Sequence, residues 1–146
     1  MSGVTTVMED YLEKIYTIRE RKGFVRVKDI ARELNVSAPS VTEMLHKLGR
    51  QKLIRYERYQ PVLLTSRGER IAKSTHMRHE TLTLLLKMIL VSDGIAEEDA
   101  CKIEHQLSPE TIEQLSKFVG FMRESVRQTE WPESFRAYCA SHKKKS

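Results

Sequence analysis

The segment from residue 27 to residue 50, VKDIARELNVSAPSVTEMLHKLGR, limits the possible folds of this chain more than any other segment. Its first part is a short helical pattern that stops at Asn35, a residue type that tolerates the left-handed conformation found where helices end. Ser37 then offers the hydroxyl of an N-cap, and Pro39 stands in the first turn of a second helical pattern, where its missing N–H costs nothing. Two helices joined by so short a turn predict a helix-turn-helix.

The flanking residues predict the rest of a winged helix. Apolar residues at helical spacing indicate a first helix from about Val7 to Gly23, a natural C-cap. After the helix-turn-helix, two runs rich in β-branched, aromatic and leucine residues surround the turn Gln60-Pro61, which predicts a two-stranded hairpin. Residues 8–65 therefore read as helix, helix, tight turn, helix and hairpin.

The two halves of the chain carry opposite charge. Residues 1–75 contain 15 Lys/Arg against 9 Asp/Glu, whereas residues 76–142 contain 7 against 11, before a final run of three lysines. A basic half indicates a polyanionic partner, and a basic winged helix indicates double-stranded DNA. The alternative is a helix-turn-helix that makes protein contacts and has a solvated basic face.

In a helix-turn-helix the start of the third helix lies in the major groove, and here its side chains are small or carry hydroxyls. Glu43 can accept a hydrogen bond from a cytosine amino group, while the basic residues that follow are expected to contact phosphates. The predicted DNA-binding residues are Ser37, Ala38, Pro39, Ser40, Thr42, Glu43, Lys47, Arg50, Arg55 and Arg58.

The second half is predicted to be helical. A long helix is expected from about Arg67 to about Ile89, then a break at Asp93-Gly94, a helix from about Ala96 to Leu107, and a further helix capped by Ser108. The predicted fold is mainly α with a small β-wing, with a DNA-binding domain in residues 1–73 and a helical domain in residues 74–146.

Composition bounds the location of the chain. No stretch approaches the roughly 18 to 20 continuous apolar residues of a membrane helix, and the N-terminus lacks the pattern of a signal peptide. Two cysteines, 38 positions apart, do not make a disulfide framework. We therefore expect a cytoplasmic protein with reduced thiols that are available as ligands.

Cys101, Glu104 and His105 stand at i, i+3 and i+4, so a helix would place all three on one face. Sulfur, oxygen and nitrogen donors together suit Fe(II), Co(II) or Zn(II) and, less naturally, Mn(II). The alternative is a cysteine that packs as a small hydrophobe beside an ordinary polar edge. Asp10 and Glu13 share a face of the first helix, but they also suit the positive end of a helix. The spacing leaves open whether these groups meet.

Five stretches in order, MEDYLEKIY, VRVKDIARELNVSAPSVTEMLHKL, LTSRGERIA, RHETL and ACKIEHQLS, resemble the diphtheria-toxin-repressor family of metal-activated transcriptional repressors. The resemblance covers roughly residues 7–122, and the length is similar to the two-domain manganese-transport-regulator branch. It implies a winged helix, a helical dimerisation domain, a homodimer on palindromic operators, and a regulatory metal between the first helix and the second domain. The implied ligands are Asp10, Glu13, His79, Cys101, Glu104 and His105.

This ligand set mixes two branches of the family. Asp10 is similar to the manganese branch, whereas Cys101 is similar to the iron branch. The iron branch also has a second metal site. Thr83 stands at the position of a glutamate ligand of that site, and Glu97 at the position of a histidine ligand. A thiolate in place of a hard carboxylate weakens the preference for Mn(II). We therefore expect Fe(II) to be slightly favoured over Mn(II), with Co(II) or Zn(II) able to substitute.

The expected mechanism is thermodynamic linkage between metal binding and DNA binding. The ion can favour the DNA-binding state of the protein only by binding that state more tightly than the state that does not bind DNA. One rival is a metal-independent winged-helix regulator that senses a small organic ligand or the oxidation of Cys101 or Cys139. A metallo-enzyme is disfavoured, because no base or nucleophile next to the cluster is left unclaimed as a ligand. The expected dimer surface, whose residues could instead fill the core, is Leu84, Leu85, Ile89, Leu115, Phe118 and Phe121.

Overall fold

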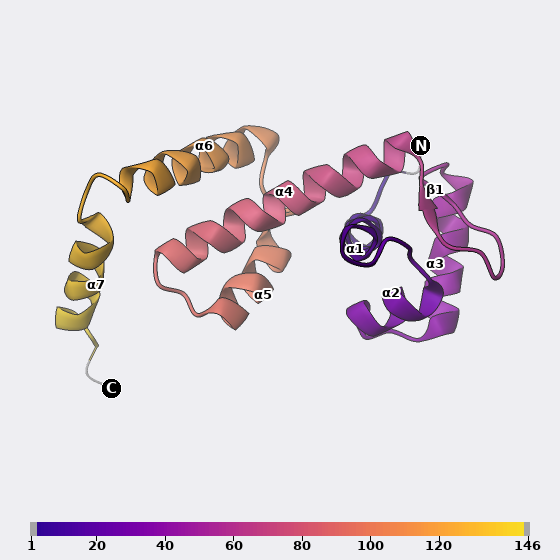
Figure 1. Ribbon diagram of the computed structural model, residues 1–146, viewed down its shortest axis with the longest axis horizontal. Coiled ribbons are helices and arrows are strands. Elements are labelled where there is room, and N and C mark those ends of the chain that lie inside the picture. The colour runs from indigo at the N-terminus through magenta and orange to yellow at the C-terminus, as the bar shows by residue number, and fades with distance from the viewer. Residues whose placement is uncertain (1–2, 145–146) are drawn as a thin grey trace. The chain divides into compact units, whose positions relative to one another are not determined.

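A computed structural model describes residues 3–144 as helices and one small antiparallel sheet (Figure 1). The chain forms two compact units, which we call unit 1, ending at His76, and unit 2, beginning at Met77. Unit 1 contains three helices and the hairpin, while the remaining helices belong to unit 2, apart from the long helix that begins in one and ends in the other. The predicted class, mainly α with a small β-wing, is confirmed.

The helices of unit 1 end where their capping residues predict. Gly23 has φ 90° and its N–H donates to the carbonyl of Arg19, while Asn35 has φ 52° at the turn of the helix-turn-helix. The Ser37 hydroxyl accepts a hydrogen bond from the backbone N–H of Ser40. The elements of unit 1 are α1 (Thr6–Lys22), α2 (Val27–Leu34), α3 (Ala38–Arg50), β1 (Ile54–Arg55), β2 (Leu63–Leu64) and the first part of α4 (Ser66–Met88).

The hairpin is short and is tied to the start of α4. Ile54 pairs with Leu64 and Arg55 with Leu63 in antiparallel register. Thr65 follows β2; its backbone N–H donates to the carbonyl of Leu53 at 3.1 Å, and its hydroxyl proton is shared between the carbonyls of Lys52, at 2.8 Å, and Leu53, at 3.0 Å. The same hydroxyl accepts from the backbone N–H of Gly68, so Thr65 caps α4. These bonds fix the wing relative to the helix that follows it.

A single apolar core holds unit 1 together. Each of its central side chains is inaccessible to solvent, and burying one such side chain contributes about 1.5–3 kcal/mol. Because α3 contributes its whole inward stripe to this core, its opposite face is held outward in a fixed orientation. The members with no exposed surface are Leu12, Ile15, Ile18, Ile30, Val41, Leu45, Leu48, Leu53 and Ala72.

Unit 2 differs from the prediction at its second helix, α5. This helix begins at Asp93 instead of about Ala96, so the expected break at Asp93-Gly94 is wrong. An aspartate is favourable in the first turn of a helix, and there it lies 3.9 Å from the ammonium of Lys87. The helices of unit 2 are the rest of α4, α5 (Asp93–Ile103), α6 (Pro109–Ser125) and α7 (Trp131–Ser141).

Among the described residues of unit 2, the only buried apolar side chains are Leu82, Ala96, Ala100 and Val119. Several large apolar side chains of the same unit are exposed instead, with Phe118 at 48% and Phe121 at 65%. None of the helices formed by residues 3–144 is long and apolar enough to cross a bilayer.

Candidate metal centre and nucleic-acid interface

Glu104 is the most deeply buried charged residue of unit 2, and it lies just beyond the last turn of α5. Its side chain is inaccessible to solvent, and one carboxylate oxygen lies 3.1 Å from Nδ1 of His79 on α4. The other oxygen lies 3.1 Å from Nε2 of His105, but the two are not in hydrogen-bonding geometry. A buried carboxylate is costly unless it is fully paired, so this oxygen calls for a further electropositive partner.

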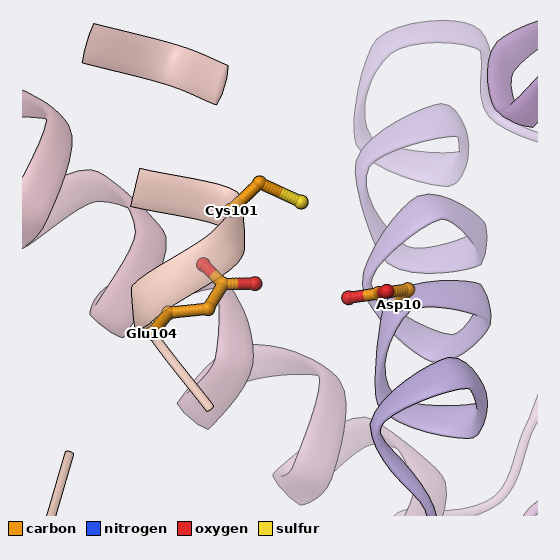
Figure 2. A group of neighbouring side chains, drawn as sticks. All are labelled: Asp10, Cys101 and Glu104. Atoms are coloured by element: carbon orange, nitrogen blue, oxygen red, sulfur yellow. The ribbon is translucent and has the colours of Figure 1, made fainter. Parts of the chain in front are cut away.

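Cys101 lies beside the same carboxylate. The residue is exposed, and its sulfur lies within 4.8 Å of a carboxylate oxygen of Glu104, one turn further on. Figure 2 shows both side chains leaving the α5 segment on the same side. Glu104 retains helical φ and ψ values although α5 ends at Ile103, which is shorter than the predicted end at Leu107. Cys101 and Glu104 therefore keep the i, i+3 helical spacing expected from the sequence, although Glu104 lies beyond the end of α5.

The remaining predicted ligands belong to unit 1. Asp10 and Glu13 lie one turn apart on α1, and Figure 2 draws the Asp10 side chain projecting from that helix. Glu13 is buried, and one of its carboxylate oxygens lies 3.5 Å from Nδ1 of His76 on α4.

The donor set of unit 2 fits a divalent transition ion. Donors about 2.0–2.3 Å from a common ion, at tetrahedral or octahedral angles, lie about 3–3.5 Å from one another. The His79 Nδ1 contact with Glu104, at 3.1 Å, is a hydrogen bond, whereas the His105 Nε2 contact, also at 3.1 Å, falls in that range without hydrogen-bonding geometry. A carboxylate oxygen that is buried beside an imidazole without a hydrogen bond between them is also what a missing cation would leave.

The predicted DNA-contacting residues lie on the outward face of α3 and on the wing. All of them are exposed apart from Thr42, which is half-buried. The carboxylate of Glu43 lies 3.6 Å from the ammonium of Lys47, which supplies the positive neighbour that an acidic residue near phosphates needs. The guanidinium of Arg67 donates a hydrogen bond to the carbonyl of Gln51 at the end of α3. It therefore stabilises α3, the helix expected to lie in the major groove.

A basic hollow of about 880 Å³ lies between α3, the wing and the start of α2. Its lining includes three cationic side chains, those of Arg26, Lys28 and Arg58, together with His46 and Tyr56. Cations around a concave surface concentrate positive potential where a sugar-phosphate backbone can enter. The hollow adds Arg26 and Lys28 to the candidate phosphate contacts, which the sequence prediction had left out.

An ion-pair network fixes α2 beneath this surface. Asp29 is 2% exposed and receives hydrogen bonds from the Lys22 ammonium at 2.8 Å and the Arg26 backbone N–H at 3.0 Å, while Arg32 lies 3.0 Å away. Burial alone would raise the pKa of Asp29, but these hydrogen bonds and positive charges lower the pKa below its ordinary value. Asp29 therefore stays ionised and holds the start of α2.

Two family models match nearly the whole chain. Residues 3–62 match the N-terminal DNA-binding domain of the iron dependent repressors, and residues 65–133 match the metal-binding and dimerisation domain of the same family. The chain belongs to the iron dependent repressor family. It is a metal-dependent DNA-binding transcriptional regulator, and the resemblance predicted from its motifs is confirmed.

Relatives of this iron dependent repressor include the HTH-type transcriptional regulator MntR of Shouchella clausii, 41% identical over 83% of this chain and 85% of the relative. MntR of Bacillus subtilis is 41% identical over 82% of this chain and 84% of that protein. The matched segments thus span more than four fifths of this chain and of each relative.

Solved structures give the same fold. The manganese regulator SloR matches with TM-score 0.68 and 31% identity over 82% of this chain, and a manganese-dependent transcriptional repressor in complex with manganese matches with TM-score 0.69 and 29% identity over 77%. This chain spans 55% and 52% of those two chains, so each is about twice as long as the part it shares with this repressor.

Proposed function

We propose that a divalent transition-metal ion binds this repressor through Asp10, Glu13, His79, Cys101, Glu104 and His105, and that the bound ion controls how unit 1 engages DNA. The observation that carries the proposal is the buried Glu104 carboxylate with an imidazole nitrogen 3.1 Å from each oxygen. α1 supplies two of the six donors and unit 2 supplies four. One ion held by both sets would join the two units.

Joining the units gives the ion a means of regulation. Without it, unit 1 can adopt several positions relative to unit 2; with it, the arrangements that separate the two donor sets are removed. The ion favours the DNA-binding arrangement only by its higher affinity for that arrangement, and coupling of this kind is typically about 1–3 kcal/mol, or about 5–150-fold in DNA affinity. By reciprocity, operator DNA raises the affinity for the metal by the same factor.

The identity of the physiological metal rests on Cys101. Thiolate and imidazole donors favour Fe(II), Co(II) and Zn(II), whereas carboxylate donors suit Mn(II). Fe(II) stands slightly ahead of Mn(II), because the three carboxylates of the proposed set are balanced by one thiolate and two imidazoles. The solved neighbours named as manganese regulators favour the opposite order.

The proposed partner is a palindromic DNA operator bound by a homodimer. Two recognition helices related by a twofold axis read two equivalent half-sites. The exposed apolar side chains of unit 2, including Phe118 and Phe121, supply the dimer surface, because a patch of this kind on a monomer marks an interface. The bound dimer would repress metal-uptake genes when the ion is plentiful.

An anaerobic Co(II) titration of metal-stripped protein tests the proposal, because thiolate-bound cobalt gives an intense charge-transfer band. We expect a saturating band that is lost in Cys101→Ala and kept in the control Cys139→Ala, which removes the other cysteine. In parallel, fluorescence anisotropy with a duplex selected from a random pool in the presence of metal should show tighter binding with Fe(II) or Mn(II) than with EDTA. DNA binding that ignores every metal would instead favour a ligand-sensing or thiol-sensing regulator.

A further inference from the structure

A second basic hollow, of about 750 Å³, lies where the wing meets the start of α4, and we call it the α4 hollow. All of its lining residues belong to unit 1. Its described wall contains five cationic side chains and no acidic one. These cations come from the last turn of α1, the turn after α3, the wing and the start of α4, and they are Arg19, Lys52, Arg55, Arg67 and Arg70.

Most of the positive charge around the α4 hollow is not neutralised by the protein itself. Among residues 3–144, the ion pairs of this wall belong to Arg19 alone, which lies 2.9 Å from Glu69 and 3.2 Å from Glu20. The guanidinium of Arg67 donates to the carbonyl of Gln51, which leaves its charge uncompensated. Cations gathered around a concave surface without counter-charges raise the local positive potential. The α4 hollow therefore favours an anionic ligand.

The backbone adds to this potential at the same place. The hollow reaches Ser66 and Arg67 in the first turn of α4, a helix of 23 residues. The start of a helix carries a partial positive charge, and its first N–H groups point toward a bound anion. Lys52 lines the hollow although its φ of 58° would suit a glycine better. The chain thus presents an ammonium group here at a conformational cost.

The α4 hollow is continuous with the surface that is expected to contact DNA. A smaller hollow, of about 310 Å³, shares Arg55 and Leu63 with the α4 hollow. It also shares Tyr56 and Gln60 with the first basic hollow, the one between α3, the wing and the start of α2. Glu57, in the smaller hollow, is the one acidic residue along the described walls of the three. A continuous basic track around the wing fits a polymer with regularly spaced negative charges better than it fits one small anion.

We propose that the α4 hollow binds the sugar-phosphate backbone of the DNA that flanks the half-site read by α3. The first basic hollow would contact phosphates beside the recognition helix, and the α4 hollow would contact phosphates further along the same duplex. Contacts of this kind add affinity and fix the orientation of the protein, but they read no sequence. The operator would therefore be longer than the set of bases that α3 contacts. This inference needs only the DNA binding of the family and does not depend on which residues hold the metal.

Interference mapping with a matched pair of double variants tests the proposal. Lys52→Gln/Arg70→Gln removes two exposed cations of the α4 hollow and leaves the residues at the start of α3 unchanged. The control Arg21→Gln/Lys73→Gln removes two exposed cations of unit 1 that lie outside the three hollows. The duplex is the one selected from the random pool, extended on each side by about one helical turn of arbitrary sequence, about 10 base pairs. The metal is the ion that gives the tightest binding in the anisotropy assay.

Methylation interference locates the bases that the protein reads, and ethylation interference locates the phosphates that it contacts. We expect the wild type and the control to show ethylation interference at phosphates outside the bases that are read. Lys52→Gln/Arg70→Gln should lose this outer interference and keep the central interference at bases and phosphates. Outer interference that is the same in all three proteins would overturn the proposal.

The salt dependence of the affinity gives a second readout. On the extended duplex, the slope of log affinity against log salt should be shallower by about 2 in Lys52→Gln/Arg70→Gln, with an affinity lower by about tenfold or more at about 0.1 M salt. On a duplex trimmed to the bases that are read, the same variant and the wild type should bind alike. Equal slopes on the extended duplex would overturn the proposal. So would equal slopes together with saturable binding of tripolyphosphate that only this variant loses, because the hollow would then hold a small free anion. If circular dichroism shows that the double variant is unfolded, Arg70→Glu provides the same comparison at one exposed position.

Discussion

Gly68 offers the sharpest test of how the wing is joined to α4. A methyl group at Gly68 would overlap the carbonyl oxygen of Leu53 and lie 2.9 Å from its carbonyl carbon, whereas ordinary carbon–carbon contacts are about 3.5–4.0 Å. The obstacle is backbone, so it cannot rotate away. The same carbonyl accepts both hydrogen bonds from Thr65, and any shift that makes room for the methyl group weakens them.

The expected cost of Gly68→Ala follows from these contacts. Overpacking costs about 1–3 kcal/mol, and weakening two hydrogen bonds adds about 0.5–1.5 kcal/mol each. Replacing glycine by alanine within a helix returns about 0.5–1 kcal/mol. We therefore expect Gly68→Ala to lower the free energy of unfolding by about 1–5 kcal/mol. The motif LTSRGERIA contains this glycine, so its role there is to let α4 start against the wing.

Urea unfolding of the metal-stripped protein, followed by far-ultraviolet circular dichroism, measures this change as a shift in the midpoint at constant slope. Gly49→Ala is the matched control, since a Cβ at this helical glycine of α3 meets nothing within 4 Å. That variant should gain about 0.5–1 kcal/mol. Equal shifts in the two variants, or a Gly68→Ala midpoint at or above wild type, would refute the packing argument.

Three further predictions concern other parts of the molecule. Asp29 has a lowered pKa in the folded state, so its contribution to stability is present above the ordinary carboxyl pKa of about 4 and is lost as the pH falls below that value. Asp29→Asn should therefore flatten the dependence of the urea midpoint on pH between about 5 and 3. Lys52 has φ 58° directly after α3, so Lys52→Gly should raise the free energy of unfolding by about 0.5–1 kcal/mol, and an unchanged thermal midpoint would contradict this. Phe121→Glu, at an exposed apolar position, should convert the homodimer to monomer in sedimentation velocity while circular dichroism stays unchanged.

The helix-turn-helix could be predicted well from the sequence, because the residue types at the ends of its helices determine where those helices begin and end. Gly23, Asn35 and Ser37 each fix a boundary through their own backbone or hydroxyl, and no distant contact is needed. The start of α5 was missed because Asp93 and Gly94 are also the residues of turns. In the structure the Ala96 N–H donates to the carbonyl of Ser92 at 2.8 Å, which makes Asp93 part of the first helical turn.

The candidate metal centre was likewise predictable only in part. Cys101 and Glu104 could be paired from the sequence because helical spacing places them on one face, and the structure keeps that spacing beyond the end of α5. The contact between His76 and Glu13 could not be predicted, because it depends on how α4 packs against α1. Periodicity along one helix contains no information on that packing.

The sparse core of unit 2 has a consequence for the amount of working protein in a cell. Among its described residues, two of the four buried apolar side chains are alanines, so folding of the single chain removes little large apolar surface from water. When a second copy covers the exposed phenylalanines, part of the stability comes from association and grows with concentration by mass action. A cell making few copies would hold less folded repressor per copy, and proteolysis would remove the remainder. Basal expression of the protein would thus set a threshold for repression that is independent of the metal.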